Sequence, residues 1–147
     1  MPKGFQIRRF QPDDRAQWRT LWRGYLDFYE AAVEEAATEL VWRRLLDPAG
    51  PIRGFCADED GRLLGLTHYL FHPVTWSAGP RCYLEDLFTA KEARGRGVGE
   101  ALIRAVYADA DAHEADQVYW LTARDNARAQ RLYDRVARQT RFVKYMR

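Results

Sequence analysis

The chain carries a short glycine-rich segment, "RGRGVG" at residues 94–99, between an apolar run and a helical pattern. Glycine loses more backbone freedom on folding than any other residue, so three glycines in five positions need a structural reason. A glycine-rich turn that opens a helix presents backbone N–H groups at the positive end of the helix dipole, where phosphate is the usual occupant. Arg94 and Arg96 add positive charge. The segment predicts a phosphate site, and the alternative is a plain tight turn with glycine caps.

The two common nucleotide-binding motifs do not fit this segment. In the dinucleotide fingerprint G-x-G-x-x-G, the third glycine would fall on Glu100 when counted from Gly95, and on Leu102 when counted from Gly97. The triphosphate loop is excluded as well, because no G-K-[ST] follows. A phosphate ligand of another kind is therefore expected.

Two adjacent acids, Glu85 and Asp86, interrupt the apolar run "YLEDLF". Strand alternation predicts that they point to opposite faces of a sheet, so at least one should reach a cleft or a charged partner. For Glu85 the alternative to a functional role is an ion pair with an arginine. For Asp86 such a structural role is the preferred interpretation.

The remaining reactive side chains predict no further chemistry. Cys56 and Cys82 form no C-x-x-C pair, and lone thiols indicate a reducing compartment, so we expect a cytoplasmic protein. Cys82 is interpreted as a small buried residue. His68 and His72 lie in a segment that reads as a strand, so we expect them to be structural and expect no metal site. The start of the chain has no signal-peptide pattern, and no apolar run is long enough to span a membrane.

Length and composition indicate one globular domain over residues 1–147. The chain is 47% hydrophobic, which is enough for a core, and its 23 basic and 21 acidic residues leave a net charge of +2. The basic residues are scattered, so no nucleic-acid partner is expected.

The hydrophobic pattern predicts the elements that position these residues. It indicates an α/β domain with a mixed sheet flanked by helices, in the order β-α-α-β-β-β-α-β-α-β. The first half contains a hairpin with the turn "DEDG", and the second half is a β-α-β-α-β unit. The expected elements are a strand at 5–10, a helix that includes Trp18 to Tyr29, a second helix through Leu40 to Leu46, strands at 52–58, 62–73 and 81–90, a helix at 99–112, a strand at 117–123, a helix at 126–137 and a strand at 141–146.

At this point the residues resemble a known family. "RGRGVG" matches the [Q/R]-x-x-G-x-[G/A] signature of the GNAT family of N-acetyltransferases. "YLEDLFTAKEARGRGVGEAL" is similar to the diamine (spermidine/spermine and thialysine) acetyltransferases, and "DNARAQRLYDRVARQTRFVKY" to the yeast histone and polyamine acetyltransferase-like branch. The resemblance runs from residue 5 to the end. It implies a cytoplasmic enzyme that uses acetyl-CoA and acetylates a primary amine by direct attack in a ternary complex.

The resemblance also implies roles for individual residues. Glu85 would be the general base, acting on the amine or on its activating water, and Tyr133 the general acid that protonates the leaving sulfur. Tyr133 also lies on the apolar stripe of its helix, so a core role is the alternative. A bulge in the strand would expose backbone groups to the pantetheine arm. The implied cofactor-binding residues are Leu87, Phe88, Thr89, Arg94, Gly95, Arg96, Gly97, Val98, Gly99, Glu100, Asn126, Ala129 and Tyr133.

The first two helices predict the acceptor side of the site. Acids interleaved with aromatic residues suit a cationic amine through charge and cation–π contact, although a run of glutamates is also typical of a solvated helix face. The candidate substrate-binding residues are Tyr25, Glu30 and Glu85. Polyamine, thialysine, free amino acid, aminoglycoside and protein lysine all stay open as acceptors.

One departure from the family pattern concerns the end of the chain. Ala137 stands where a glycine is usual, and only one strand is expected to follow. An uncovered sheet edge tends to pair with another chain, so we expect a homodimer. Two functions of other classes stay open, namely a non-catalytic acyl-CoA-binding module and an interaction protein with a chance glycine loop.

Overall fold

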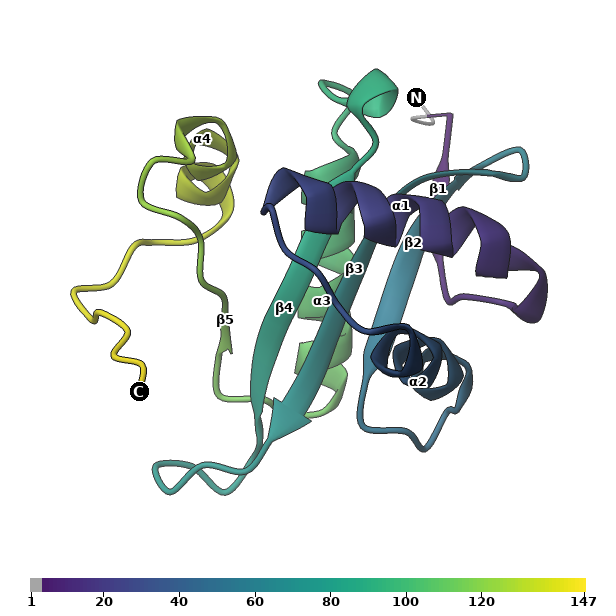
Figure 1. Ribbon diagram of the computed structural model, residues 1–147. Coiled ribbons are helices and arrows are strands. Elements are labelled where there is room, and N and C mark those ends of the chain that lie inside the picture. The colour runs from purple at the N-terminus through teal and green to yellow at the C-terminus, as the bar shows by residue number, and fades with distance from the viewer. Residues whose placement is uncertain (1–3) are drawn as a thin grey trace.

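The computed structural model describes residues 4–147, which form a mixed five-stranded sheet in the order β1-β2-β3-β4-β5. Strands β1 to β4 are antiparallel, and β5 runs parallel to β4. Figure 1 shows α1 and α2 on one face of the sheet and α3 on the other. The predicted mixed α/β class is confirmed. The elements are β1 (Gln6–Arg8), η1 (Pro12–Asp14), α1 (Arg15–Phe28), α2 (Glu35–Leu46), β2 (Arg53–Glu59), β3 (Arg62–His72), β4 (Arg81–Thr89), η2 (Lys91–Ala93), α3 (Val98–Ala112), β5 (Val118–Tyr119) and α4 (Ala127–Val136).

Apolar clusters on the two faces of the sheet hold the site's elements in place. On the α1 face, Trp18 and Trp22 of α1 pack with Trp42 of α2 and with Leu66 of β3. The second cluster, on the α3 face, contains Tyr69, Cys82, Leu84, Ile103, Val106 and Ala110. No helix within residues 4–147 is long and apolar enough to cross a membrane.

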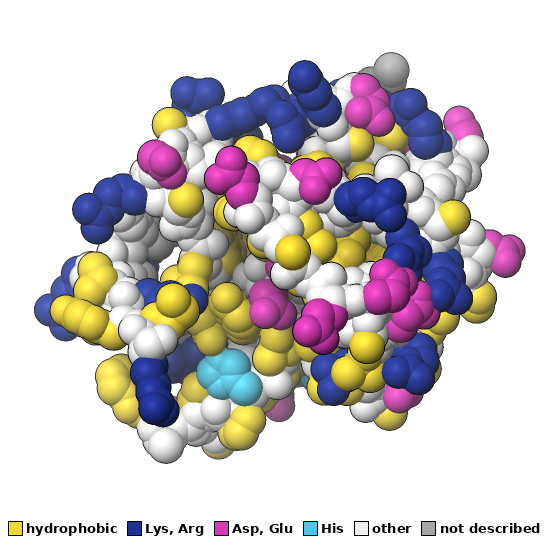
Figure 2. All heavy atoms as spheres, viewed as in Figure 1, with side chains coloured by type: hydrophobic (Ala, Val, Ile, Leu, Met, Phe, Trp, Pro, Cys, Tyr) yellow, Lys and Arg dark blue, Asp and Glu magenta, His cyan; other side chains and the backbone are white. Residues whose placement is uncertain are grey.

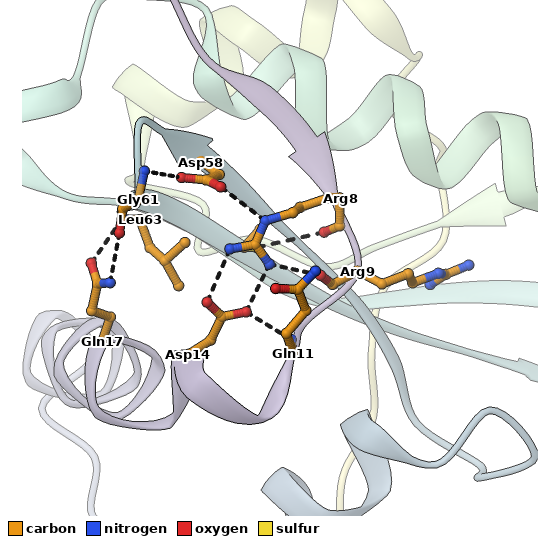
Figure 3. A network of polar contacts seen from close by, with 9 residues as sticks. Arg8, Arg9, Gln11, Asp14, Gln17, Asp58, Gly61 and Leu63 are labelled. Atoms are coloured by element: carbon orange, nitrogen blue, oxygen red, sulfur yellow. Dashed lines mark hydrogen bonds and ion pairs between the residues drawn. The ribbon is translucent and has the colours of Figure 1, made fainter.

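A polar network fixes the start of α1 against the first two strands (Figure 3). The Arg8 guanidinium donates to both carboxylate oxygens of Asp14, at 2.7 and 3.0 Å, and to Asp58 at 2.9 Å. Gln17 of α1 donates to the Gly61 carbonyl at 2.8 Å and accepts from the Leu63 N–H at 2.9 Å. Bidentate guanidinium–carboxylate pairs are geometrically specific, so this network sets the direction in which α1 crosses the sheet.

A bulge in β4 corrects the predicted alternation. Leu84 lies opposite Tyr69 and Asp86 lies opposite His68, so Glu85 is an extra residue with no partner on β3. Leu84 packs in the α3-side cluster, whereas Asp86 bonds to His68 on the α1 side. The charges of Glu85 and Asp86 both act on Tyr25 of α1. The two acids therefore share the α1 side, because one inserted residue shifts the alternation of the strand.

The end of the chain also differs from the prediction. The strand β5 has two residues instead of the expected seven, and the segment 141–146 forms no strand. A strand needs a partner for its backbone groups, and a two-residue β5 offers almost no ladder. The tail therefore leaves Phe142 74% and Tyr145 92% exposed. In Figure 1 it runs beyond α4 along the β5 side of the sheet.

Candidate active site

A pocket of about 450 Å³ opens where the C-terminal end of β4, the N-terminus of α3, the end of α1 and helix α4 meet. The predicted cofactor residues gather here, with the exception of Arg96. The pocket is lined by Tyr25, Phe28, Tyr29, Leu87, Phe88, Thr89, Arg94, Gly95, Gly97, Val98, Gly99, Glu100, Asn126, Arg128, Ala129, Leu132, Tyr133 and Arg135. The glycine segment and the candidate acid Tyr133 thus share one cavity.

The glycine segment builds the turn that opens α3. Gly95 and Gly97 have φ values of 81° and 83°, a region that other residues rarely adopt. Gly97 caps α3, and the first bond into the helix runs from the Ala101 N–H to the Gly97 carbonyl at 3.0 Å. The N–H groups of residues 98–100 precede that bond and have no carbonyl partner in the helix. They are available to a phosphate.

Gly99 serves a different purpose from the other two glycines. A Cβ atom there would lie 3.1 Å from the Leu132 side chain of α4. The residue therefore allows α4 to approach α3 closely, and α4 in turn closes the pocket.

Arginines surround the phosphate end of the pocket. Arg94 comes from the turn, and Arg128 and Arg135 come from α4. Arg135 also pairs with Glu100 at 3.3 Å. The sequence analysis missed Arg128 and Arg135, because arginines on the polar face of a helix have the same pattern as a solvated surface.

Three predicted residues, Arg96, Glu30 and Glu85, lie outside the lining of the pocket. The guanidinium of Arg96 pairs with Glu59 of β2. Glu30 follows α1 in a left-handed conformation with a φ of 52° and is exposed. Glu85 lies on β4, two residues before Leu87 of the lining.

The far end of β4 presents free backbone to the pocket. Leu87, Phe88 and Thr89 pair with β3 on one side, and β5 pairs with β4 only at Cys82 and Tyr83. Within residues 4–147, the second edge of β4 at Leu87–Thr89 therefore has no strand partner. An extended ligand with amide groups can bond along such an edge. The turn, the arginines and this edge together fit a diphosphate that carries an amide-containing arm.

Tyr133 lies on the pocket wall with its ring against Trp120, at a centroid distance of 5.3 Å. Burial raises the pKa of its hydroxyl to about 12, and the nearby Tyr29 adds to the shift. The phenol therefore keeps its proton at neutral pH. The position combines the two interpretations of Tyr133, because the ring packs at the edge of the α3-side cluster while the residue lines the pocket. Asn126 caps α4 by accepting the Ala129 N–H at 3.4 Å.

The surface beside the pocket, on the α1 side of β4, is aromatic and acidic. Glu85 is exposed, and desolvation by its neighbours, together with the charge of Asp86, raises its pKa above the usual 4.5. Tyr25 and Tyr29 of α1 stand on the same side. Figure 2 shows hydrophobic side chains in the recess between α1 and the C-terminal segment, with acidic side chains beside them. This surface suits a positively charged acceptor.

The cysteines do not fit the role of nucleophile. Cys56 and Cys82 are both buried, and burial raises the pKa of each thiol to about 12. Because the thiolate is the nucleophilic form, neither side chain is activated for a covalent step.

Comparison with known proteins identifies the family. The model of the acetyltransferase (GNAT) family matches residues 18–137, and the chain belongs to this family. It is 35% identical to the D-amino-acid N-acetyltransferase HPA3 of Saccharomyces cerevisiae, over 96% of this chain and 89% of the yeast protein. The protein is therefore an N-acetyltransferase, and both the expected family and the expected enzyme class are confirmed.

Solved structures support the fold. AAC(6')-Iy in complex with the bisubstrate analogue CoA-S-monomethyl-acetylneamine has a TM-score of 0.81 and 22% identity, with 97% of each chain covered. A putative acetyltransferase from Agrobacterium tumefaciens has the same TM-score and identity, with 97% of this chain and 99% of that chain covered. Both share the arrangement of strands and helices described above.

Proposed function

We propose that the protein transfers an acetyl group from acetyl-CoA to a small primary amine that arrives as an ammonium ion. The observation that carries this proposal is the pair Glu85 and Asp86 on the α1 side of β4, beside the tyrosines of α1. The turn 94–99, the N–H groups of residues 98–100 and the arginines of α4 would hold the diphosphate of the cofactor. When bound, acetyl-CoA supplies an activated acetyl thioester with a thiolate leaving group.

Two side chains would move the protons. An ammonium has no lone pair, so the amine must lose a proton before it attacks, and the carboxylate of Glu85 would take that proton directly or through a water. The raised pKa of Glu85 makes it a stronger base than an ordinary glutamate. The hydroxyl of Tyr133 would give its proton to the departing sulfur. Its high pKa ensures that the proton is present at the start of each turnover.

The acidic acceptor side favours a polyamine or a related small diamine. Two carboxylates attract an extended cation and repel the carboxylate of an amino acid. The second candidate acceptor is a D-amino acid, which is favoured by the 35% identity to the yeast D-amino-acid N-acetyltransferase.

The first experiment measures release of free thiol from acetyl-CoA with a panel of amines. The panel contains spermidine, thialysine, an aminoglycoside, a histone-tail peptide, and the D and L forms of lysine and alanine. We expect release with spermidine. Release with D-alanine but not with spermidine would establish the second candidate. The proposal fails if no amine supports release while acetyl-CoA binds.

We further propose that the protein is a cytoplasmic homodimer. The two free cysteines suit a reducing compartment. The second copy would cover β5 at the edge of the sheet, together with the exposed side chains of the tail, Phe142, Val143, Tyr145 and Met146. Exposed apolar patches of this kind are typical of protein–protein contacts.

A further inference from the structure

A chain of three buried polar side chains runs from the core to the acceptor side of the site. The indole Nε1 of Trp18 on α1 donates to Nε2 of His68 on β3 at 3.0 Å. Nδ1 of His68 lies 2.9 Å from Oδ2 of Asp86 on β4. Trp18 is fully buried, His68 is 1% exposed and Asp86 is 9% exposed. The sequence analysis treated His68 and Asp86 as structural residues, and the proton transfers proposed above involve neither side chain.

The geometry fixes the protonation of the histidine. An indole N–H can only donate, so Nε2 of His68 must accept and carries no proton. The ring proton of a neutral imidazole then lies on Nδ1, which donates it to the carboxylate of Asp86. His68 is therefore held as the neutral Nδ1–H tautomer. It can take a second proton only by losing the bond to Trp18.

The surroundings of His68 offer few other charges. The rings of Phe10 and Trp22 pack against it, with Trp22 at a centroid distance of 5.3 Å. The other titratable groups near these hydrogen-bonded side chains all lie close to the Asp86 carboxylate. They are Glu85 and Tyr83 on β4, and Tyr25 and Tyr29 on α1. A neutral imidazole leaves the negative charge of Asp86 intact, directly beside Glu85.

We propose that His68, locked by Trp18, is a positioning residue that keeps Asp86 as a permanent anion next to Glu85. That anion attracts the ammonium of the acceptor and strengthens Glu85 as its proton acceptor. This inference rests on the function proposed above. It assigns the acceptor side to cationic amines, because a negative charge at its base favours them.

The first test examines the wild-type protein and does not depend on catalysis. A proton–nitrogen correlation spectrum of the imidazole rings distinguishes the tautomers, and the chain has only three histidines to assign. We expect the Nδ1–H pattern for His68 at neutral pH. An Nε2–H pattern overturns the proposal.

The second test removes the lock. In Trp18→Phe, Nε2 of His68 is free to accept a proton, and the Asp86 carboxylate stabilises the resulting imidazolium, which cancels the anion at lower pH. We expect the KM for the amine to be about tenfold higher near pH 6 than near pH 8, beyond any change in the control. The matched control is Trp22→Phe, because the Trp22 indole nitrogen, although buried, has no hydrogen-bond partner within residues 4–147.

The outcomes separate this inference from the proposed function. The KM for the amine at the lower pH is divided by its value at the higher pH in each variant. If this ratio is the same in Trp18→Phe and Trp22→Phe, the inference is overturned and the proposed acetyl transfer stands. If the wild-type protein acetylates no amine, the proposed function fails, and the spectrum still decides whether His68 is locked. If Trp18→Phe does not fold, the spectrum of the wild-type protein decides the matter alone.

Discussion

Tyr133 has an environment that matches a proton donor better than a proton acceptor. Its ring packs against Trp120, and burial raises the pKa of its hydroxyl to about 12. The proposed base, Glu85, is exposed, and desolvation together with the charge of Asp86 raises its pKa from a low starting value. Environments that suit one group to give a proton and another to take it are the basis of acid–base assignments in active sites.

Replacing Tyr133 with phenylalanine removes the proton donor and keeps the ring. We expect kcat to fall by about 10²-fold, with little change in the KM for acetyl-CoA, as is usual for the loss of one acid–base group. Steady-state thiol release measures both quantities, with Tyr145→Phe as the control because Tyr145 is 92% exposed. An unchanged kcat would leave Tyr133 with the packing role alone.

Replacing Glu85 with glutamine should lower activity and raise stability at the same time. Its raised pKa means that the ionised form is disfavoured in the folded protein, so wild-type stability is lost as pH rises through that pKa. Glu85→Gln should therefore melt at a higher temperature than wild type at pH 7, and this advantage should vanish below the usual value of 4.5. We expect kcat/KM to fall by about 10²-fold and its acid limb to disappear. Melting curves at two pH values and a pH–rate profile measure these effects, and a variant that melts below wild type at pH 7 contradicts the assignment.

At the scale of single elements, the turn into α3 is the part most dependent on particular residues. Gly95 and Gly97 are left-handed, whereas Gly99 is there for the close approach of α4. The turn, β4 and α4 each contribute one wall of the pocket. A change in the turn should therefore affect the cofactor before it affects the acceptor.

The Gly97→Ala variant tests this dependence. A Cβ atom at a φ of 83° is strained by about 1–2 kcal/mol, and it would crowd a phosphate at the N-terminus of α3. We expect that loss of stability together with a KM for acetyl-CoA at least about tenfold higher, a factor worth 1.4 kcal/mol. Gly61→Ala is the matched control, because Gly61 has a φ of 90° in the hairpin turn, with nothing within 4 Å of its Cβ position. Equal KM values in the two variants would show that the turn does not hold the cofactor.

At the scale of the whole molecule, the two ends of the chain are supported very differently. The elements from β1 to α3 share the buried clusters, whereas α4 buries no residue fully and the tail is exposed. Helix α4, which forms one wall of the pocket, is therefore the helix with the fewest buried residues. A partner that packs on the tail and on the edge at β5 would support that wall.

The homodimer predicts a specific response to substitution in the tail. We expect the wild-type protein to sediment as a dimer at micromolar concentration, and Phe142→Asp to sediment as a monomer, because a buried unpaired charge destabilises an interface. Trp76→Asp is the control, since Trp76 is 87% exposed on the loop between β3 and β4 and belongs neither to the tail nor to β5. A wild-type monomer, or equal behaviour of the two variants, argues against the interface.

Local patterns predicted most of the fold because their physical causes are local. The helix α1 and the turn "DEDG" each depend on residues that are neighbours in the sequence, so their patterns predict them. Asp60 and Gly61 adopt the positive φ values that such a turn needs. The glycine segment likewise indicated its turn. The strand expected at 141–146 was wrong because a strand depends on a partner elsewhere in space, which the pattern of the segment does not contain.

The site was predictable where a residue type has few uses, and less so where it has many. Glycines before a helix and an asparagine at its start have specific backbone roles. Arg128 and Arg135 have no such signature, and the sharing of one face by Glu85 and Asp86 depends on a bulge that alternation alone does not predict. The bond from Trp18 to His68 joins residues 50 positions apart, so only the folded structure brings them together.

The bulge in β4 has a consequence for how such a site can arise and disappear. Leu84 and Asp86 already lie opposite consecutive residues of β3. Deletion of Glu85 would therefore leave all the other side chains of β4 on their present faces of the sheet, which is true of no other residue in the strand. A single inserted codon is therefore enough to add the second carboxylate to this sheet, and the loss of one codon is enough to remove it. Paired acids at this position can be gained or lost within a lineage while the rest of the strand stays in register.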